Sequence, residues 1–195
     1  MHGFTLDGLP ATLWKNGGGT TRQVLSWPPG AGLDDFAWRV SVAQIASDGP
    51  FSRFEGVDRQ IMLLQGAGVR LTGEGVDHRL DTPWRPFAFA GELALQCARL
   101  GGDSIDFNVM ARRALGRARV SVLRPTAPVA LDGDFGLLLV LHGACRLQGR
   151  SLAAGQGAWW AGMPAAGGAR RLEPGPADTG AAAVFVRWLP RADSA

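Results

Sequence analysis

The chain is poor in cysteine and in long apolar runs, and each shortage narrows the classes of protein that it can be. No run approaches the ~20 apolar residues that a membrane helix needs. Residues 1–5 also lack the basic and apolar regions of a secretory signal peptide, so we expect a cytoplasmic protein with no membrane partner. The two cysteines, Cys97 and Cys145, lie inside apolar runs, which favours buried reduced thiols over a disulfide framework.

Lysine is nearly absent, because 19 of the 20 basic residues are arginine. The formal net charge is +3 and the pI is about 9.6, which raises the question of nucleic-acid binding. The arginines are scattered singly, with short clusters only at residues 112–113 and 170–171, and they form no stripe interleaved with aromatic residues. We therefore expect no nucleic-acid partner.

The only lysine lies beside three consecutive glycines, in the sequence Trp-Lys-Asn-Gly-Gly-Gly-Thr-Thr-Arg at residues 14–22. It is not a phosphate-binding loop, because Lys15 precedes the glycines and a strand follows them. Triple glycine suits positive φ or a close approach of the backbone to a ligand or a crossing strand. Two interpretations stay open: a tight turn before the first strand, or a ligand-contacting loop. The candidate contacts of that loop are Trp14, Lys15, Asn16, Gly17, Gly18, Gly19 and Thr20.

Turn residues punctuate the chain, which contains 28 glycines and 12 prolines, and no long stretch shows helical periodicity. The sequence therefore predicts an all-β fold with little helix. Residues 62–71 resemble residues 139–147, and residues 86–91 resemble residues 157–162, which indicates an internal duplication. This rhythm of strands and turns is typical of the jelly roll and resembles the cupins. Any two β-hairpins share part of the pattern, so chance similarity between the copies remains an alternative.

Three histidines are too few, and too far apart in sequence, to supply the usual metal cluster of a cupin. With Gly66 as the glycine of the cupin metal motif, Arg59 takes the position of the glutamate ligand, and residues 52–55 take those of the histidines. A guanidinium cannot bind a cation. In the second copy, Gly143 places Gly136 at the glutamate position. We therefore expect no metal and no cofactor, and structural or surface roles for His78 and His142.

Four motifs together resemble the HutD/Ves family of bicupins, which is associated with bacterial histidine utilisation. They are residues 14–21, residues 38–43 (Trp-Arg-Val-Ser-Val-Ala), residues 48–59 and residues 106–110 (Asp-Phe-Asn-Val-Met). The resemblance is close over residues 10–115 and mainly one of pattern beyond them. It implies a metal-free double cupin, with an N-terminal half at 1–115, a mainly structural half at 116–195, and strands that could exchange between them. It also implies a regulatory or binding role, with N-formyl-glutamate as the candidate ligand.

Polar residues alternate with apolar ones along two of these motifs. Arg39 and Ser41 share one face of a predicted strand, and Asn108 and Met110 share one face of another. If these faces line a barrel, Arg39 and Arg59 could clamp carboxylates, Lys15 could add a point charge, and Asn108 could bind an amide or formyl group. The alternatives are ion pairs of the arginines with Asp48 or Asp58, and a bulge or a capping role for Asn108.

No nucleophile, base and orienting group occur in a recognisable motif, so the sequence nominates no catalytic residue and favours binding over catalysis. The expected function is the binding of a small anionic metabolite of histidine degradation by a metal-free bicupin. The alternative is a metal-independent cupin enzyme with Lys15 and Asn108 in its site. The sequence does not decide the oligomeric state, and a homodimer is compatible with it.

Overall fold

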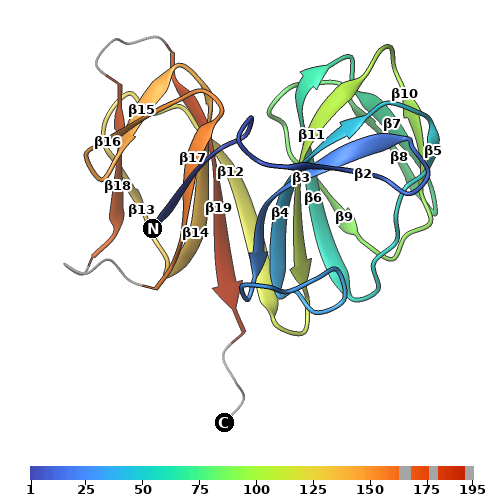
Figure 1. Ribbon diagram of the computed structural model, residues 1–195, viewed down its shortest axis with the longest axis horizontal. Coiled ribbons are helices and arrows are strands. Elements are labelled where there is room, and N and C mark those ends of the chain that lie inside the picture. The colour runs from blue at the N-terminus through green and yellow to red at the C-terminus, as the bar shows by residue number, and fades with distance from the viewer. Residues whose placement is uncertain (163–167, 176–179, 192–195) are drawn as a thin grey trace. The chain divides into compact units, whose positions relative to one another are not determined.

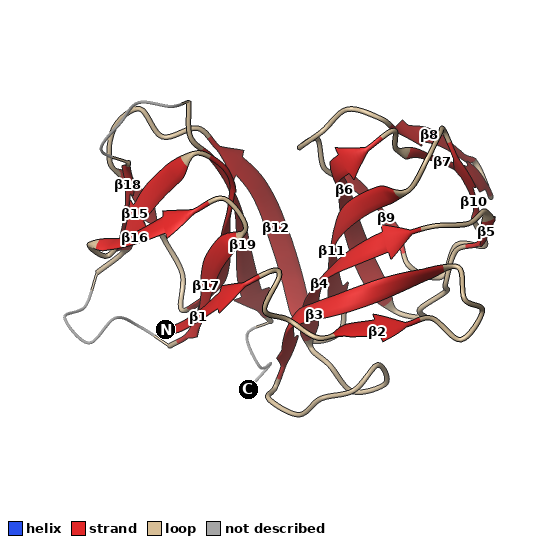
Figure 2. Cartoon of the chain, turned by 45° about the horizontal axis from the view of Figure 1, so that its top comes forward, coloured by secondary structure: helices blue, strands red, loops and turns tan. Residues whose placement is uncertain are grey.

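The computed structural model describes residues 1–162, 168–175 and 180–191, and these residues form strands and loops without any helix (Figure 2). The all-β prediction is confirmed. The turn glycines of the two sequence repeats, Gly66 and Gly143, have φ of 101° and 67°, a region that other residues adopt rarely. The described residues include no helix long and apolar enough to cross a membrane.

Contacts divide the chain into two compact units. The N-terminal unit consists mainly of Leu9–Arg117. The C-terminal unit consists of Ala118–Leu189 together with Met1–Gly8. The first eight residues belong to the C-terminal unit although they are adjacent in sequence to the N-terminal unit. Strand β1 (His2–Thr5) pairs antiparallel with strand β17 (Gln156–Ala161) of the C-terminal unit.

The N-terminal unit contains a six-stranded and a four-stranded antiparallel sheet (Figure 1). The six-stranded sheet has the order β2 (Ala11–Leu13), β3 (Gly19–Trp27), β4 (Trp38–Ile45), β11 (Ser104–Arg112), β6 (Val57–Gly66) and β9 (Phe87–Ala90). The four-stranded sheet has the order β5 (Gly49–Pro50), β10 (Gln96–Arg99), β7 (Val69–Gly73) and β8 (Val76–Leu80).

The C-terminal unit also contains two sheets. One has the order β1, β17, β14 (Phe135–His142), β19 (Ala182–Pro190) and β12 (Gly116–Leu123). The other has the order β13 (Val129–Leu131), β18 (Arg170–Pro174), β15 (Ala144–Leu147) and β16 (Arg150–Ala153).

Strand order reveals the duplication more clearly than sequence identity does. The order β4-β11-β6-β9 in the N-terminal unit is repeated as β12-β19-β14-β17, and β5-β10-β7-β8 is repeated as β13-β18-β15-β16. The predicted repeat is therefore present in the topology. Strands β2 and β3 extend the first copy beside β4, and β1 extends the second copy beside β17.

The core of the N-terminal unit lies between its two sheets. Ile45 on β4 and Ile61 and Leu63 on β6 pack against residues of the four-stranded sheet, including Leu71 and Cys97. Because side chains alternate along a strand, the odd-numbered residues of β4 and β6 share this inner face. Cys97 and the C-terminal unit's Cys145 are both free and buried, as the sequence predicts.

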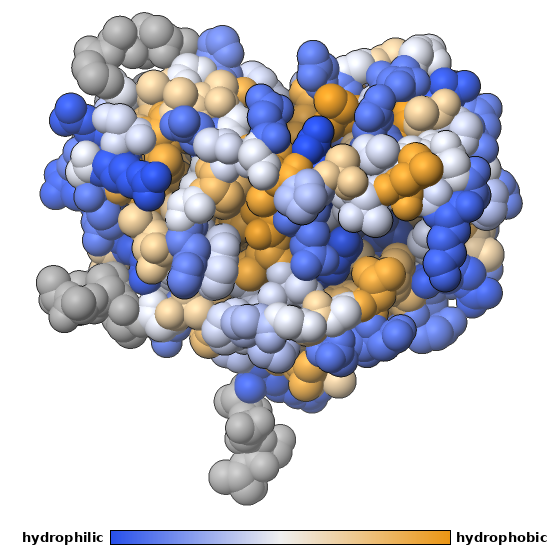
Figure 3. Space-filling model, viewed as in Figure 1, coloured by the Kyte–Doolittle hydropathy of each residue, from blue (hydrophilic) through white to orange (hydrophobic). Residues whose placement is uncertain are grey.

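The outer face of the four-stranded sheet is polar. Arg70 pairs with Asp77 at 2.6 Å across β7 and β8, and Arg99 pairs with Asp48 at 3.3 Å. Figure 3 shows a mainly hydrophilic surface at the right of the view, where Figure 1 labels these strands. Exposed ion pairs contribute little stability, so their role here is to keep this face solvated.

Candidate functional site

Two buried arginines lie on the inner face of the six-stranded sheet. Strand β11 is hydrogen-bonded to β4 on one side and to β6 on the other. Met110 on β11 is in register with Arg39 on β4 and with Arg59 on β6. Neighbouring strands are ~4.8 Å apart, so the two arginines start at the same level of the sheet with Cα atoms ~10 Å apart. Their exposed fractions are 9% and 5%.

Arg39 is held by three neighbours on the same face. Its Nε donates to Oε1 of Gln23 at 3.0 Å, and its Nη1 donates to Oγ of Ser41 at 3.3 Å. Nη1 also lies 3.9 Å from Sδ of Met110. No carboxylate of the described residues pairs with this guanidinium, and burial lowers its pKa. Gln23 is exposed, so Arg39 lies just beneath the surface of the unit.

Arg59 is enclosed by aromatic rings. The carbon of its guanidinium lies 4.5 Å from the ring centroid of Phe51, 5.5 Å from that of Phe54 and 5.2 Å from that of Phe89. Its Nη1 donates to the carbonyl of Ser52 at 2.9 Å. Such rings attract the cation but supply no counter-charge, so the guanidinium keeps its full positive charge inside the unit.

Asn108 supplies the remaining partner of Arg59. Its Oδ1 accepts a hydrogen bond from Nη2 of Arg59 at 3.1 Å, and its own strand position is in register with Ser41. The amide therefore occurs inside a strand because it satisfies a buried cation. The bulge in this region lies elsewhere, between Ile105 and Asp106 in the pairing of β11 with β6.

The two carboxylates considered as alternative partners of these arginines pair elsewhere. Asp58 accepts from Arg113 at 2.6 Å, and Asp48 accepts from Arg99. The acidic residue that lies near Arg59 is instead Asp106, whose charge raises the pKa of Arg59. Burial and the charge of Arg39 outweigh this effect and lower the pKa of Arg59 to about 9, so the guanidinium is charged at neutral pH.

Asp106 is the site residue that the sequence argument missed. It is 2% exposed, and neither carboxylate oxygen has a hydrogen-bond partner among the described residues. Burial raises its pKa to about 7, although the charge of Arg59 opposes the shift. The signal was available, because Asp106 alternates with Asn108 and Met110 on the same face of β11.

The triple-glycine loop closes against the end of β4. A Cβ on Gly19 would lie 2.1 Å from the carbonyl oxygen of Gln44, and a Cβ on Gly18 would lie 2.5 Å from Oγ of Ser47. Gly17 has a φ of 69°. The crossing-strand explanation of the glycines is thus visible in the structure, and a contact with a ligand stays a prediction.

The other residues of this loop point in different directions. Trp14 packs against the inner core, and its Nε1 donates to Oγ1 of Thr21 at 2.8 Å. Asn16 Oδ1 accepts from the backbone N–H of Gly18 at 3.0 Å. Lys15 lies exposed on the loop. Thr20 alternates with Thr21, so its side chain leaves the face that Thr21 shares with the core.

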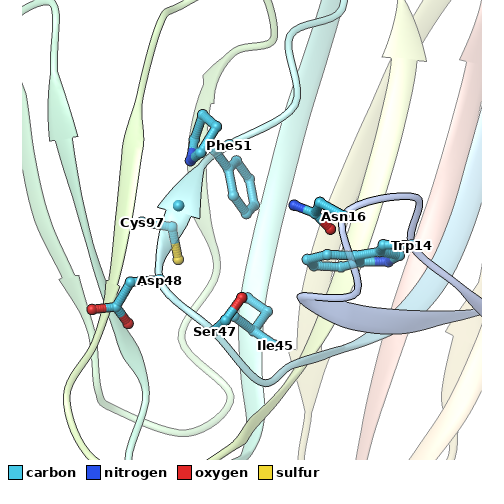
Figure 4. Close-up of a pocket in the computed structure, with 9 residues that line it drawn as sticks. Trp14, Asn16, Ile45, Ser47, Asp48, Phe51 and Cys97 are labelled. Carbon is cyan, nitrogen blue, oxygen red and sulfur yellow. The ribbon is translucent and has the colours of Figure 1, made fainter.

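A small pocket lies between this loop and the strand β5 region (Figure 4). Trp14 and Asn16 form one side, and Asp48, Phe51 and Cys97 form the other. The volume of this cavity is ≈ 20 Å³, which is about enough for one ordered water molecule. Phe51 both lines this pocket and lies over the guanidinium of Arg59, which is not itself among the lining residues.

By the spacing of the cupin metal motif, different residues stand at the glutamate position in the two units. In the N-terminal unit this residue is Arg59. In the C-terminal unit it is Gly136, where a Cβ would lie 2.5 Å from the ring of Trp160. Phe185 stacks on that indole with centroids 5.9 Å apart. The described residues contain no group of three histidine, cysteine or acidic side chains placed to hold a metal ion.

Histidines and tryptophans mostly have structural roles. His78 stacks on Phe87 with centroids 3.7 Å apart, as expected for a structural histidine. Trp38, Trp160 and Trp188 are buried. Trp159 is not a core residue: it is only half-buried and stacks on His2 of β1, with centroids 4.1 Å apart, because alternation turns it away from the face of Trp160.

Comparisons with known proteins agree on the family. The HutD family model matches residues 7–172. Protein Ves of Cronobacter sakazakii is 39% identical over 161 residues, which are 82% of this chain and 87% of that protein. Protein Ves of Escherichia fergusonii is 35% identical over 162 residues, which are 82% of this chain and 83% of that protein.

Solved structures extend the agreement to three dimensions. HutD from Pseudomonas fluorescens, solved in a formate condition, has a TM-score of 0.83 and 26% identity, covering 97% of this chain and 98% of that one. A conserved protein of unknown function from Pseudomonas aeruginosa has a TM-score of 0.81 and 32% identity, covering 95% of this chain and 97% of that one. A bacterial pirin from Escherichia coli, at 11% identity and a TM-score of 0.64, shares the cupin fold alone. The chain is a double cupin and belongs to the HutD family.

Proposed function

We propose that the N-terminal unit binds a small carboxylate metabolite of histidine degradation at Arg39 and Arg59. The observation that carries the proposal is the excess of positive charge between the sheets. Two buried guanidinium groups share this interior with one buried carboxyl group, Asp106, and neither oxygen of Asp106 has a hydrogen-bond partner among the described residues. Buried charges in proteins are normally paired, so an anionic ligand would complete this set.

The chemistry of the two arginines favours a carboxylate. A guanidinium offers a planar fork of N–H donors that matches a carboxylate in a bidentate pair. Two guanidinium groups at the same level of the sheet suit a dicarboxylate. N-formyl-glutamate, the candidate that the family resemblance implies, carries two carboxylates and a formamide, and Asn108 lies between the strands of the two arginines.

Access to Arg59 requires a side chain to move. Phe51 lines the pocket beside Trp14, and its ring also lies over the guanidinium of Arg59. Arg39 is nearer to solvent, because its partner Gln23 is exposed. We therefore place the first contact of the ligand at Arg39 and the second at Arg59 after Phe51 turns aside.

A regulatory role in histidine utilisation, in the cytoplasm, is part of the proposal and rests on family membership combined with a binding site.

The catalytic alternative gains no support from its two residues. Lys15 is exposed, and Asn108 Oδ1 is engaged by Arg59. A binding protein returns its ligand unchanged, so incubation with the ligand followed by mass spectrometry separates the two functions.

Thermal unfolding with a panel of histidine-pathway intermediates tests the proposal. A ligand that binds only the folded state at 100 times its Kd stabilises it by about 2.7 kcal/mol. We expect stabilisation by N-formyl-L-glutamate and less by urocanate or histidine. The Arg39→Gln variant should lose the shift, and the exposed Arg79→Gln variant should keep it. An equal shift in both variants, or no shift across the panel, would overturn the proposal.

A further inference from the structure

Asp106 carries a buried carboxyl group. The proposed ligand is an anion, so it would not bind directly to an ionised carboxylate. The side chain of Asp106 is on the face of β11 that looks between the sheets, two residues from Asn108 and four from Met110. Both oxygens are buried, and neither receives a hydrogen bond from the described residues. An ionised carboxylate without donors is costly in such surroundings, whereas a protonated carboxyl group is not.

Charged and titratable groups from four elements act on Asp106 or on its neighbours. Arg39 on β4 and Arg59 on β6 lie on the same inner face as Asp106 on β11. Cys97 is on β10 of the opposite sheet, and burial, followed by the charge of Asp106, raises the pKa of that thiol. Asp48, before β5, acts on the same thiol. Arg59 is thus the group that favours the ionised form of Asp106, and it does so without a hydrogen bond.

An incoming carboxylate competes for that guanidinium. Arg59 Nε is buried and has no partner among the described residues, so it is available to a ligand oxygen. Once the ligand neutralises Arg59, Asp106 loses its stabilising charge and gains a like charge nearby. Both changes favour protonation of a carboxyl group. We propose that Asp106 takes up one proton when a carboxylate binds at Arg39 and Arg59, so that the anion and the proton bind together.

The coupling rests on the proposed function and gives it a definite dependence on pH. The pKa of Asp106 in the free protein is already raised to about 7 by burial, which places the transition within the physiological range. The ligand raises this pKa further, so the affinity for the ligand is highest where Asp106 is protonated. It falls by up to about tenfold per pH unit between the free and the bound pKa. Below pH ~6, where Asp106 is protonated in both the free and the bound protein, the affinity for the ligand is constant.

Calorimetric titration with formate and with N-formyl-L-glutamate, between pH 6 and 8, tests the coupling. Both probes stay ionised throughout this range. At each pH the titration is repeated in buffers that differ in ionisation enthalpy, which yields the number of protons exchanged. We expect uptake that approaches one proton near pH 7.5 in the wild type. The Asp106→Asn variant, which imitates the protonated carboxyl group, should bind with no proton exchange and with an affinity independent of pH.

Matched controls keep the two proposals apart. The Asp77→Asn variant removes an exposed carboxylate of the outer face and should retain proton uptake and pH dependence. Binding without proton uptake in the wild type, or uptake that persists in Asp106→Asn, overturns the coupling and leaves the binding site standing. If neither carboxylate binds at any pH, both the site and the coupling are wrong. Circular dichroism confirms that Asp106→Asn is folded before the titrations are compared.

Discussion

Arg39 and Arg59 stand on opposite sides of Met110, which is in register with both across adjacent strands. This relationship brings two residues that are 20 positions apart to one level of the inner face. In the proposed function, these two cations form the site for a carboxylate ligand. The wider site also includes Asn108, which bonds Arg59, and Asp106, which offsets part of the charge.

Arg39 is the arginine whose loss is expected to affect binding with the least damage to the fold. In Arg39→Gln, affinity for N-formyl-L-glutamate should fall about tenfold to a hundredfold, because a hydrogen bond to a charged group contributes roughly 1.5–3 kcal/mol. Isothermal titration of the variant beside Arg79→Gln measures this. Retention of full affinity in Arg39→Gln would place the ligand elsewhere.

Asp106 should make stability depend on pH in a direction opposite to that of most carboxylates. Its pKa in the folded protein is about 7, above the unfolded value of ~3.9. Its contribution to the free energy of unfolding is therefore fully present below pH ~3.9 and is lost as pH rises through 7. Between pH 5 and pH 8 the unfolding free energy of the wild type should fall by up to ~3 kcal/mol relative to Asp106→Asn. Urea unfolding at both pH values measures the difference. A constant difference would show that Asp106 is ionised throughout.

Gly19 should tolerate no side chain. A methyl group would lie 2.1 Å from the carbonyl oxygen of Gln44, so β3 or β4 must shift in Gly19→Ala. We expect destabilisation by about 1–3 kcal/mol or more. Gly102→Ala is the control, since its new methyl group meets nothing within 4 Å, and it should change stability by less than ~0.5 kcal/mol. Similar unfolding midpoints for the two variants would remove the packing explanation of the triple glycine.

Cys97 should be chemically inert in the folded protein although it lines the pocket. Burial, together with the charges of Asp106 and Asp48, raises the pKa of its thiol to about 12. Since the thiolate is the reactive form, iodoacetamide at pH 8 should modify Cys97 at least ~100 times more slowly than it modifies a free cysteine. Both cysteines should react after denaturation in urea. Peptide mapping by mass spectrometry follows each thiol, and rapid native modification of Cys97 would disprove this expectation.

Sequence reasoning was most successful where a pattern repeats. Turn glycines and alternating residues identified the all-β fold, and the match of residues 62–71 with residues 139–147 identified the duplication that the strand order displays. The same alternation placed Arg39 and Ser41 on one face of β4. It could not decide which face lies between the sheets, because Trp38 and Val40 on the other face are buried as well.

Contacts between distant segments were beyond the sequence. Nothing in the order of residues shows that Phe51, Phe54 and Phe89 surround Arg59, since their positions depend on how the β5–β6 loop folds over β6 and β9. The exposure of Lys15 was equally beyond the sequence, and its contact with a ligand stays a prediction. The pairing of β1 with β17 was equally unforeseeable in detail, because short edge strands carry little pattern.

A crystal structure of the protein with N-formyl-L-glutamate tests the central claim most directly. The account predicts electron density for a carboxylate within hydrogen-bond distance of Arg39 and of Arg59 Nε, with the Phe51 ring turned away from the guanidinium. Ligand density confined to the pocket beside Trp14 and Asn16, with Arg59 still covered by Phe51, would contradict it.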